Sequence, residues 1–247
     1  MIFDPPLIPA QLIRRYKRFL ADVCLDDGTE LTVHTPNTGS MLGLTEPGSR
    51  IWLRDANSPT RKYRYSWEIA SSKEQMPVCV NTHLANQLVI EGIKKGVITE
   101  LQGYRELETE VQYGQERSRI DVFLTNGEGQ NGNKQDCYVE VKNVTAMLDT
   151  EGTQGIAIFP DAVTQRGSKH LRELMNMVER GQRAVIVFCV SRADATQFQP
   201  ADLIDPVYGQ LLRKAVTQGV EALAYSVNIS VTEICLKKSL PVMLPDL

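Results

Sequence analysis

The sequence predicts a mixed α/β (α+β) chain in two parts: a small all-β barrel over residues 1–80, and a three-layer α/β/α domain over residues 81–247. Two observations support this division. Residues 12–80 contain five short strand-like segments and no helix signal. From residue 82 onward, helix-like and strand-like hydrophobic periods follow one another. The 247 residues, 42% of them hydrophobic, provide enough apolar material for both parts.

The first part reads as a series of short strands separated by turns. Asp27-Gly28 is a typical hairpin turn, and an Asn/Ser/Pro loop follows residue 56. The predicted strands are RRYKRFLADVCL (14–25), TELTVHTP (29–36), RIWLRDA (50–56), KYRYSWEIA (62–70) and, less regular, MPVCVNT (76–82). Five short strands within about seventy residues favour a small barrel, for which an OB-fold is one candidate.

The second part begins with a predicted helix over 82–96, capped by Asn81 or Thr82 and ended by Gly96. Three strands follow, with a polar loop over 126–136 between the last two, and then come a long amphipathic helix, an apolar strand, a second helix and further strands. Their ranges are 108–114, 118–125, 137–145, 163–181, 183–190, 205–219 and 221–236. The continuous apolar run RAVIVFCV (183–190) indicates a strand covered on both faces.

Composition excludes several classes of protein. The five cysteines are odd in number and lack CxxC spacing, so they predict buried thiols in a reducing cytoplasm rather than disulfides or a zinc site. The N-terminal MIFDPPLIPAQ lacks the pattern of a signal peptide, and AVIVFCV is too short to cross a bilayer. We therefore expect a cytoplasmic protein with no membrane partner. The net charge of −3 gives no overall sign of nucleic-acid binding, but the first twenty residues are basic.

The stretch CYVEVKNVT (137–145) carries the main candidate for chemistry. Strand alternation places Cys137, Val139 and Val141 on one face, and Glu140 with Lys142 on the other. Such an acid-x-lysine match is expected about once by chance in a chain of this composition, so its surroundings must decide its meaning. The pair Glu140 and Lys142 has two interpretations: a surface ion pair, or half of a metal-dependent catalytic site.

The preceding strand supplies a second carboxylate, Asp121, among apolar residues. If the two strands pair, Asp121 and Glu140 meet and repel each other unless a cation lies between them. Mg²⁺, or Mn²⁺ in its place, suits two carboxylates, a backbone carbonyl and waters. Lys142 would lie beside the attacking water and stabilise charge on the phosphoryl group. Glu91 or Glu106 would be a third ligand, although each is more often a solvated charge.

The order of these elements around Asp121 and Glu140-x-Lys142 resembles the PD-(D/E)xK nuclease superfamily, which has the restriction-endonuclease-like fold. Ile120 stands where that motif often has proline. The resemblance implies that the helix after the catalytic strand presents polar residues to the site and the phosphate backbone. By resemblance, Gln165 and Arg166 join Asp121, Glu140 and Lys142 as catalytic residues.

Four stretches together resemble one family in particular, the bacterial sugar fermentation stimulation (SfsA) proteins. They are HTPNTGSM (34–41), RSRIDVFL (117–124), CYVEVKNVT and FPDAVTQRGSKHLREL (159–174). The resemblance covers nearly the whole chain. It implies an OB-like domain, a nuclease-like domain, DNA binding with little sequence preference, and a link to the regulation of maltose and other sugar metabolism.

Basic and turn residues provide candidate nucleic-acid contacts, because OB-folds stack bases on aromatics within a basic groove. The candidates are Arg14, Arg15, Lys17, Arg18, Asn37, Thr38, Arg64 and Lys169. Alternation within one strand would place Arg14, Tyr16 and Arg18 on one face. Simpler readings exist: Trp52 and Trp67 fill the barrel core, PNTG is plain turn chemistry, and His34 and His170 are structural.

Three functional hypotheses follow. The first is a DNA-binding protein whose Mg²⁺-dependent site hydrolyses phosphodiesters, and the second is a non-catalytic regulator that retains the fold for its DNA-shaped groove. The third is an RNA-directed activity through the barrel. The expected partner is duplex or single-stranded DNA, and a homodimer is compatible with the sequence.

Overall fold

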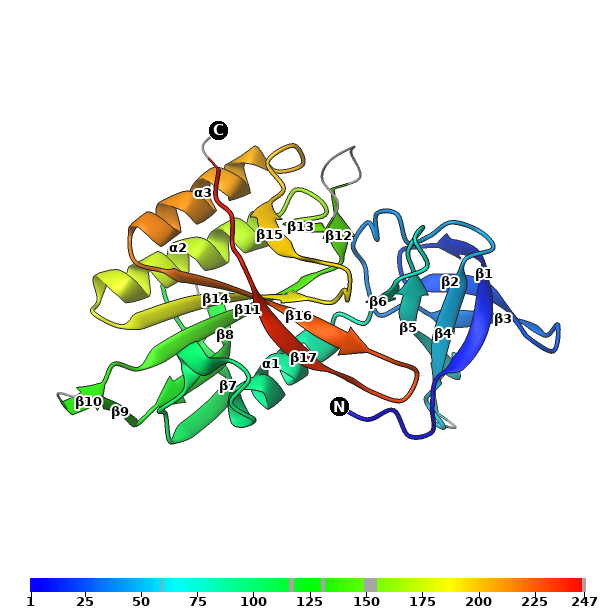
Figure 1. The fold of residues 1–247 in the computed structure, drawn as a ribbon, viewed down its shortest axis with the longest axis horizontal. Coiled ribbons are helices and arrows are strands. Elements are labelled where there is room, and N and C mark those ends of the chain that lie inside the picture. Colours follow the sequence, from blue (N-terminus) through cyan, green and yellow to red (C-terminus); the bar gives the residue numbers. More distant parts are fainter. Residues whose placement is uncertain (59, 116–117, 130–131, 149–154, 246–247) are drawn as a thin grey trace.

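A computed structural model describes residues 1–58, 60–115, 118–129, 132–148 and 155–245 of the chain (Figure 1). A β-barrel lies at one end of the molecule and a larger domain of sheet and helices at the other (Figure 1). Within these residues, no helix combines the length and the apolar character needed to cross a membrane.

Five strands form the barrel: β1 (Ile8–Tyr16), β2 (Leu20–Leu25), β3 (Glu30–His34), β4 (Arg50–Asp55) and β5 (Tyr65–Ser71). They follow the order β3-β2-β1-β4-β5, and a parallel contact between His34 and Ser66 joins β3 to β5. This contact closes the barrel, as predicted for an OB-type fold. Trp67 is fully buried in its core, whereas Trp52 is half-buried and packs against the core of the larger domain.

The strand predicted over 14–25 is in fact two strands joined by a tight turn. Lys17 and Arg18 adopt positive φ angles of 50° and 63° in the three-residue loop 17–19 between β1 and β2, a left-handed backbone conformation found mainly in turns. The alternation predicted beyond Tyr16 is therefore wrong, because the turn interrupts the strand. The predicted turn at Asp27-Gly28 lies between β2 and β3, and Gly28 has a φ of 85°.

A short sixth strand, β6 (Pro77–Cys79), pairs with the edge of β5 and leads into the larger domain. The Cys79 backbone N–H donates to the Ser191 carbonyl at 2.9 Å. Strand β6 therefore ties the barrel to the second domain at the point where the chain passes between them.

The larger domain is built on a six-stranded sheet with the order β17-β16-β14-β11-β8-β7. Strands β11, β14 and β16 are parallel to one another. The pairings of β8 with β11, β7 with β8 and β16 with β17 are antiparallel. The strands are β7 (Glu106–Tyr113), β8 (Ser118–Thr125), β11 (Cys137–Val144), β14 (Arg183–Val190), β16 (Glu221–Ile229) and β17 (Ile234–Leu240).

Helices cover both faces of this sheet (Figure 1). Helix α1 (Leu84–Lys94) packs on one face in a core with Val139, Val141 and Val187. Helices α2 (Gln165–Glu179) and α3 (Pro206–Thr217) pack on the other face with Ile186 and Phe188. The domain thus has the three predicted layers, and the prediction of the fold class is confirmed.

Several small elements lie outside the predicted set. The predicted polar loop contains a two-stranded ribbon, and a three-stranded sheet lies beside the main one. These elements are β9 (Gly127–Gly129), β10 (Gly132–Lys134), β12 (Ala146–Met147), β13 (Ile156–Phe159), β15 (Gln197–Pro200) and the 3₁₀ turn η1 (Thr99–Leu101). Strands of two to four residues are too short to produce a readable alternation, so the sequence pattern could not reveal them.

The start of α1 differs from the prediction that Asn81 or Thr82 caps it. The N-cap position is His83, and its side chain makes no capping hydrogen bond. Asn81 Oδ1 accepts from the His83 backbone N–H, and the Thr82 hydroxyl donates to the Pro36 carbonyl of the barrel at 2.9 Å. Thr82 therefore serves as a bridge between the two domains. Helix α2, by contrast, begins with a regular cap, in which the Thr164 side chain accepts from the Gly167 backbone N–H.

The first residues of the chain pack on the larger domain before the barrel begins. The backbone N–H groups of Phe3 and Leu7 donate to the carbonyls of Thr232 and Val231, in the turn between β16 and β17. Both side chains are buried in the core beneath α1. The larger domain is therefore completed by residues that precede the barrel in the sequence.

Candidate functional site

Glu140 and Lys142 lie on β11, near the middle of the central sheet, on the face covered by α2. Cys137, Val139 and Val141 face the opposite core, as strand alternation predicted. The Glu140 side chain is only 2% exposed, and its Oε1 accepts a hydrogen bond from Lys142 Nζ. The pair is therefore buried in the domain, and the reading as a solvated surface ion pair does not hold.

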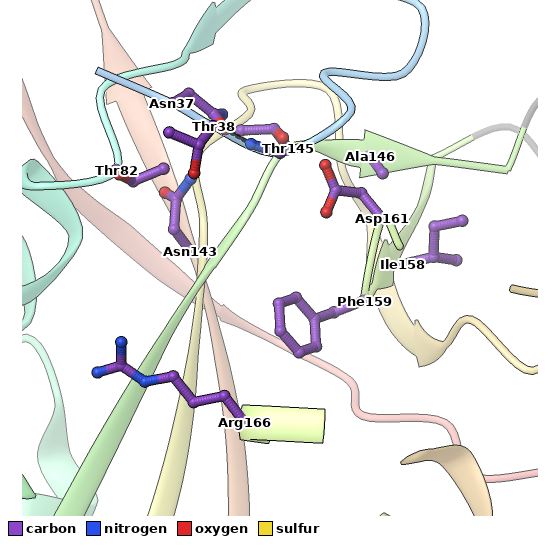
Figure 2. A pocket seen from close by; sticks show the side chains of 11 residues that line it. Asn37, Thr38, Thr82, Asn143, Thr145, Ala146, Ile158, Phe159, Asp161 and Arg166 are labelled. Carbon is purple, nitrogen blue, oxygen red and sulfur yellow. Dashed lines mark hydrogen bonds between the residues drawn. The ribbon is translucent and has the colours of Figure 1, made fainter. Parts of the chain in front are cut away.

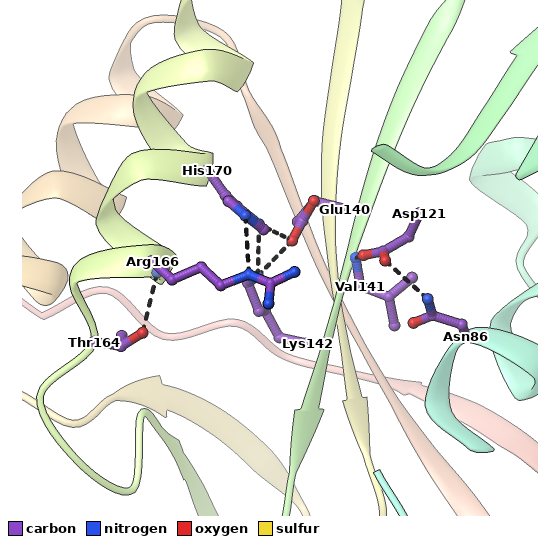
Figure 3. Close-up of polar contacts among 9 residues, drawn as sticks. Asn86, Asp121, Glu140, Val141, Lys142, Thr164, Arg166 and His170 are labelled. Atoms are coloured by element: carbon purple, nitrogen blue, oxygen red, sulfur yellow. Dashed lines mark hydrogen bonds and ion pairs between the residues drawn. The ribbon is translucent and has the colours of Figure 1, made fainter. Parts of the chain in front are cut away.

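Helix α2 adds His170 to this pair (Figure 3). Its Nδ1 is hydrogen-bonded to Glu140 Oε1 and lies 3.2 Å from Lys142 Nζ. Arg166, one turn earlier on α2, places its Nε 3.4 Å from His170 Nε2. His170 contacts the predicted acid and was interpreted from the sequence as structural. Its spacing of four residues from Arg166, which puts both on one helix face, was the available signal.

Asp121 lies on β8, which pairs with β11 in antiparallel fashion, with Val122 opposite Val139. Its Oδ1 accepts from Asn86 Nδ2 of α1 at 2.8 Å, and its Oδ2 accepts from the Val141 backbone N–H at 2.7 Å (Figure 3). The Val141 N–H thus donates to the Asp121 side chain at the point where the paired residues of β8 and β11 end. Its hydrogen bonds hold it toward α1, whereas those of Glu140 hold that carboxylate toward α2.

The two carboxylates influence each other electrostatically. Burial raises the pKa of Asp121 above its ordinary value, and the negative charge of Glu140 raises it further. Burial acts in the same direction on Glu140, but Lys142 and His170 outweigh it and lower the pKa of Glu140. Glu140 is therefore the carboxylate held as an anion, and Asp121 is the one that would gain most from a nearby cation.

The residues present fit a divalent cation in part. Glu140 Oε2 is buried and finds no hydrogen-bond partner among the described residues, which is the property of a carboxylate oxygen available to a ligand. The described part of the chain contains no cluster of three or more His, Cys, Asp or Glu side chains that would hold a metal. A cation at Asp121 and Glu140 would therefore complete its shell with backbone carbonyl oxygen and water, as Mg²⁺ commonly does.

The two candidates for a third carboxylate are engaged elsewhere. Glu91 is paired with Lys95 and with the amino group of Met1. Glu106, exposed on β7, accepts a hydrogen bond from the Thr125 hydroxyl. Neither joins Asp121 and Glu140 in a three-residue cluster within the described chain.

The predicted nucleic-acid contacts on the barrel fall into two groups. Arg14 and Arg64 are exposed and form ion pairs with Asp22 and Asp55 respectively. Arg15 instead donates to the carbonyls of Arg18, Asn37 and Gly39, at 2.6, 2.8 and 3.0 Å. Arg15 thus joins the β1–β2 turn, which exposes Lys17 and Arg18, to the loop that contains Asn37.

The remaining predicted contacts lie on α2. Gln165 and Arg166 are exposed in its first turn, and Lys169 is half-buried in the next. The loop after β3 also approaches this end of α2, where Asn37, Thr38 and Arg166 line a single pocket. Residues from the barrel and from the helix are thus brought together, although their sequence positions lie more than a hundred residues apart.

This pocket lies between the two domains and has a volume of about 400 Å³ (Figure 2). Besides Asn37, Thr38 and Arg166, it is lined by Thr82, Asn143 and Phe159. Asp161 also lines the pocket, and its Oδ2 accepts from the Ser40 backbone N–H at 2.9 Å and from the Ser40 hydroxyl at 3.0 Å. Arg166 lines the pocket and also contacts His170, so this arginine links the pocket to the acid–lysine pair.

The fold and the site define a class of two-domain proteins, in which an OB barrel is joined to an α/β/α domain with a buried acid–lysine pair beside the junction. Residues 13–80 match the family model described as the SfsA N-terminal OB domain, and residues 83–233 match the one described as the sugar fermentation stimulation protein RE domain. The chain belongs to the sugar fermentation stimulation protein (SfsA) family.

Individual relatives agree with this assignment. The chain is 54% identical over 244 residues to a sugar fermentation stimulation protein homolog of Geobacter metallireducens, covering 99% of this chain and all of the relative. It is 50% identical to the homolog of Thioalkalivibrio sulfidiphilus, covering 98% of each chain. A solved structure, described as Pyrococcus furiosus SfsA in complex with Ca²⁺, matches with a TM-score of 0.80 at 27% identity and covers 96% of each chain.

Proposed function

We propose that the protein binds DNA with little sequence preference and hydrolyses phosphodiesters at the Asp121–Glu140–Lys142 site with Mg²⁺, or Mn²⁺ in its place. The observation that carries the proposal is Glu140 itself, a buried anion with one oxygen held by Lys142 and His170 and the other without a partner in the described part of the chain. A buried, unpaired carboxylate oxygen is costly unless a ligand such as a cation binds it.

Each residue has a role in this proposal. Asp121 and Glu140 would hold Mg²⁺, which supplies Lewis-acid polarisation of the phosphoryl group. Lys142 places a positive charge beside Glu140, where it stabilises negative charge that develops on phosphoryl oxygens. His170 orients Glu140 and Lys142, whereas Arg166, exposed at the start of α2, binds the substrate phosphate together with Gln165.

Three relatives support parts of this proposal. The Pyrococcus furiosus protein is described in complex with Ca²⁺, a hard cation with the same preference for oxygen ligands as Mg²⁺. The names of the curated relatives refer to stimulation of sugar fermentation. We infer a role in regulating sugar metabolism, such as that of maltose, exerted through DNA in the cytoplasm.

The experiment that tests the proposal measures DNA cleavage and gel shifts on the same preparations, in Mg²⁺, Mn²⁺ and EDTA. We expect metal-dependent cleavage by the wild type, loss of cleavage in Lys142→Ala, and retention of the gel shift in both. Lys214→Ala is the matched control, because Lys214 is an exposed lysine on α3. Equal cleavage by Lys142→Ala and the wild type would overturn the catalytic role.

The second candidate function is a regulator that binds DNA without cutting it. The observation that favours it is that both Asp121 oxygens are already hydrogen-bonded by protein groups. It predicts gel shifts that weaken steeply with salt, and no cleavage with any divalent metal. An RNA-directed activity would appear as tighter binding of single-stranded RNA than of DNA in the same assay.

A further inference from the structure

We propose that the pocket between the domains binds one nucleotide that is not base-paired, so that the favoured substrate is single-stranded or locally opened DNA rather than continuous duplex. This inference rests on the proposed function, because it names the substrate class of the same site. The pocket is formed jointly by the loop after β3, the end of β11 and the start of α2.

The size of the pocket, together with the fixed position of its lining residue Asp161, favours a single nucleotide as the ligand. Its volume of about 400 Å³ is within the range of pockets that enclose a small molecule, and a double helix does not fit such a space. The hydrogen bonds from Ser40 hold Asp161 in the pocket lining, and they require a close backbone approach at Gly39. A Cβ at Gly39 would lie 2.7 Å from Asp161 Oδ2.

The lining has the chemical groups that recognise a nucleotide. Phe159 is half-buried, packs near Phe188 and Tyr208, and lies beside the pocket (Figure 2). Its ring would stack on a base. Asn143 Oδ1 accepts from the Ser191 hydroxyl at 2.6 Å, so its Nδ2 is the group that would donate to a base or a phosphate. Thr38, which is exposed and lines the same pocket, adds a hydroxyl.

Arg166 connects the pocket to the proposed catalytic residues. It lines the pocket and also contacts His170, which is hydrogen-bonded to Glu140. A nucleotide in the pocket would therefore have its phosphate near Arg166 and next to Lys142. A base can reach this position only after it leaves the stack, which costs least in single-stranded or mismatched DNA.

The test compares three fluorescein-labelled DNA probes of one sequence by fluorescence anisotropy in EDTA, where binding is measured without cleavage. The probes are a single strand, a blunt duplex and a duplex with one unpaired nucleotide, each about 20 nucleotides long so that the footprint of an OB-fold is covered. We expect the single strand and the unpaired duplex to bind at least about tenfold more tightly than the blunt duplex.

Variants of pocket residues, compared with matched controls, show whether the preference for unpaired DNA arises in the pocket. Phe159→Leu removes the ring but keeps an apolar side chain, Asn143→Asp keeps the acceptor for Ser191, and Thr38→Val removes one hydroxyl. We expect Phe159→Leu and Asn143→Asp each to weaken single-strand binding about fivefold or more, with a smaller loss for Thr38→Val, and each loss to be larger for the single strand than for the blunt duplex. The controls are Phe123→Leu and Thr29→Val, outside the pocket lining, and thermal melting checks that each variant is folded.

The outcomes separate this inference from the proposed function. Equal affinity for all three probes, or pocket variants that behave as their controls do, would overturn the inference even if Lys142-dependent cleavage is observed. A preference for unpaired DNA that depends on Phe159 and Asn143 supports the inference, even if no metal produces cleavage and the catalytic proposal fails.

Discussion

Glu140 of β11 and His170 of α2 are joined by a hydrogen bond that fixes the helix against the central sheet at the acid–lysine pair. The same imidazole lies within 3.2 Å of Lys142 Nζ and is contacted by Arg166 on its other nitrogen. His170 therefore contacts an anion, a cation and an exposed arginine at once. It acts through its neighbours, as a positioning residue.

The first prediction concerns this positioning role. His170→Ala should lower kcat for DNA cleavage by about 10- to 100-fold with little change in KM, because Glu140 and Lys142 lose the partner that orients them. His170→Asn retains a donor near the position of Nδ1 and should recover part of the loss. Steady-state cleavage kinetics measure both. Equal rates for the Ala and Asn variants would argue against a positioning role.

The second prediction concerns divalent cations. Mg²⁺ or Ca²⁺ should raise the melting temperature of the wild type, because a ligand bound only by the folded state at 100 times its Kd stabilises by about 2.7 kcal/mol. Glu140→Gln and Asp121→Asn should abolish this rise, and EDTA should reverse it. Glu106→Gln, which changes an exposed carboxylate on β7, is the control and should respond as the wild type does. A response to cations that survives in both site variants would place the cation elsewhere.

The third prediction concerns Glu68 of β5. Its carboxylate is buried and accepts a hydrogen bond from Asn81, which lies shortly before α1. Burial raises the pKa of Glu68 although Asn81 and Arg54 oppose the shift. Protonated Glu68 contributes its full stabilisation below the pKa that the group has in the unfolded chain, about 4.3. That stabilisation is lost as the pH rises through the higher pKa of the folded state. Glu68→Gln should therefore melt at a higher temperature than the wild type at neutral pH.

The same measurement contains its own check. The difference in melting temperature between Glu68→Gln and the wild type should shrink as the pH is lowered toward about 4, where the wild-type carboxyl is protonated as well. Glu30→Gln, on the exposed side of β3, should show no such trend. A difference that is constant with pH would mean that Glu68 does not titrate in this range.

The fourth prediction concerns Gly114, which has a φ of 73° at the end of β7. A Cβ there would lie 2.2 Å from Glu173 Oε2, whose carboxylate accepts from the Gln115 backbone N–H. Gly114→Ala should cost at least about 2 kcal/mol, whereas Gly28→Ala, with a φ of 85° and open space around it, should cost only about 1 kcal/mol. Urea denaturation of both variants measures the difference, and equal losses would show that the overlap with Glu173 is relieved without cost.

The strands and helices of the larger domain could be predicted because each is long enough to show its period. The apolar run of β14 and the amphipathic pattern of α2 are examples. The turn at Lys17 and Arg18 could not be predicted, since these residues are not typical turn formers. In the structure their φ angles are positive, and Arg15 donates to the Arg18 carbonyl.

Only those site residues that lie within a single strand could be related to one another from the sequence. Glu140 and Lys142 share β11, and Asp121 lies on the neighbouring strand β8, where it is held toward α1 while Glu140 is held toward α2. The contacts of Asn86 with Asp121 and of Ser40 with Asp161 join residues 35 and 121 positions apart. No local pattern reports such contacts, because the packing of helices and domains determines them.

The burial of Phe3 and Leu7 beneath α1 has a consequence for how the molecule unfolds. These residues precede the barrel, yet they complete the hydrophobic core of the other domain, so a fragment that begins at residue 81 would carry a cavity and exposed apolar surface. The barrel strands are thus inserted between two segments of one core. We expect the two domains to melt in a single cooperative transition, as one thermodynamic unit.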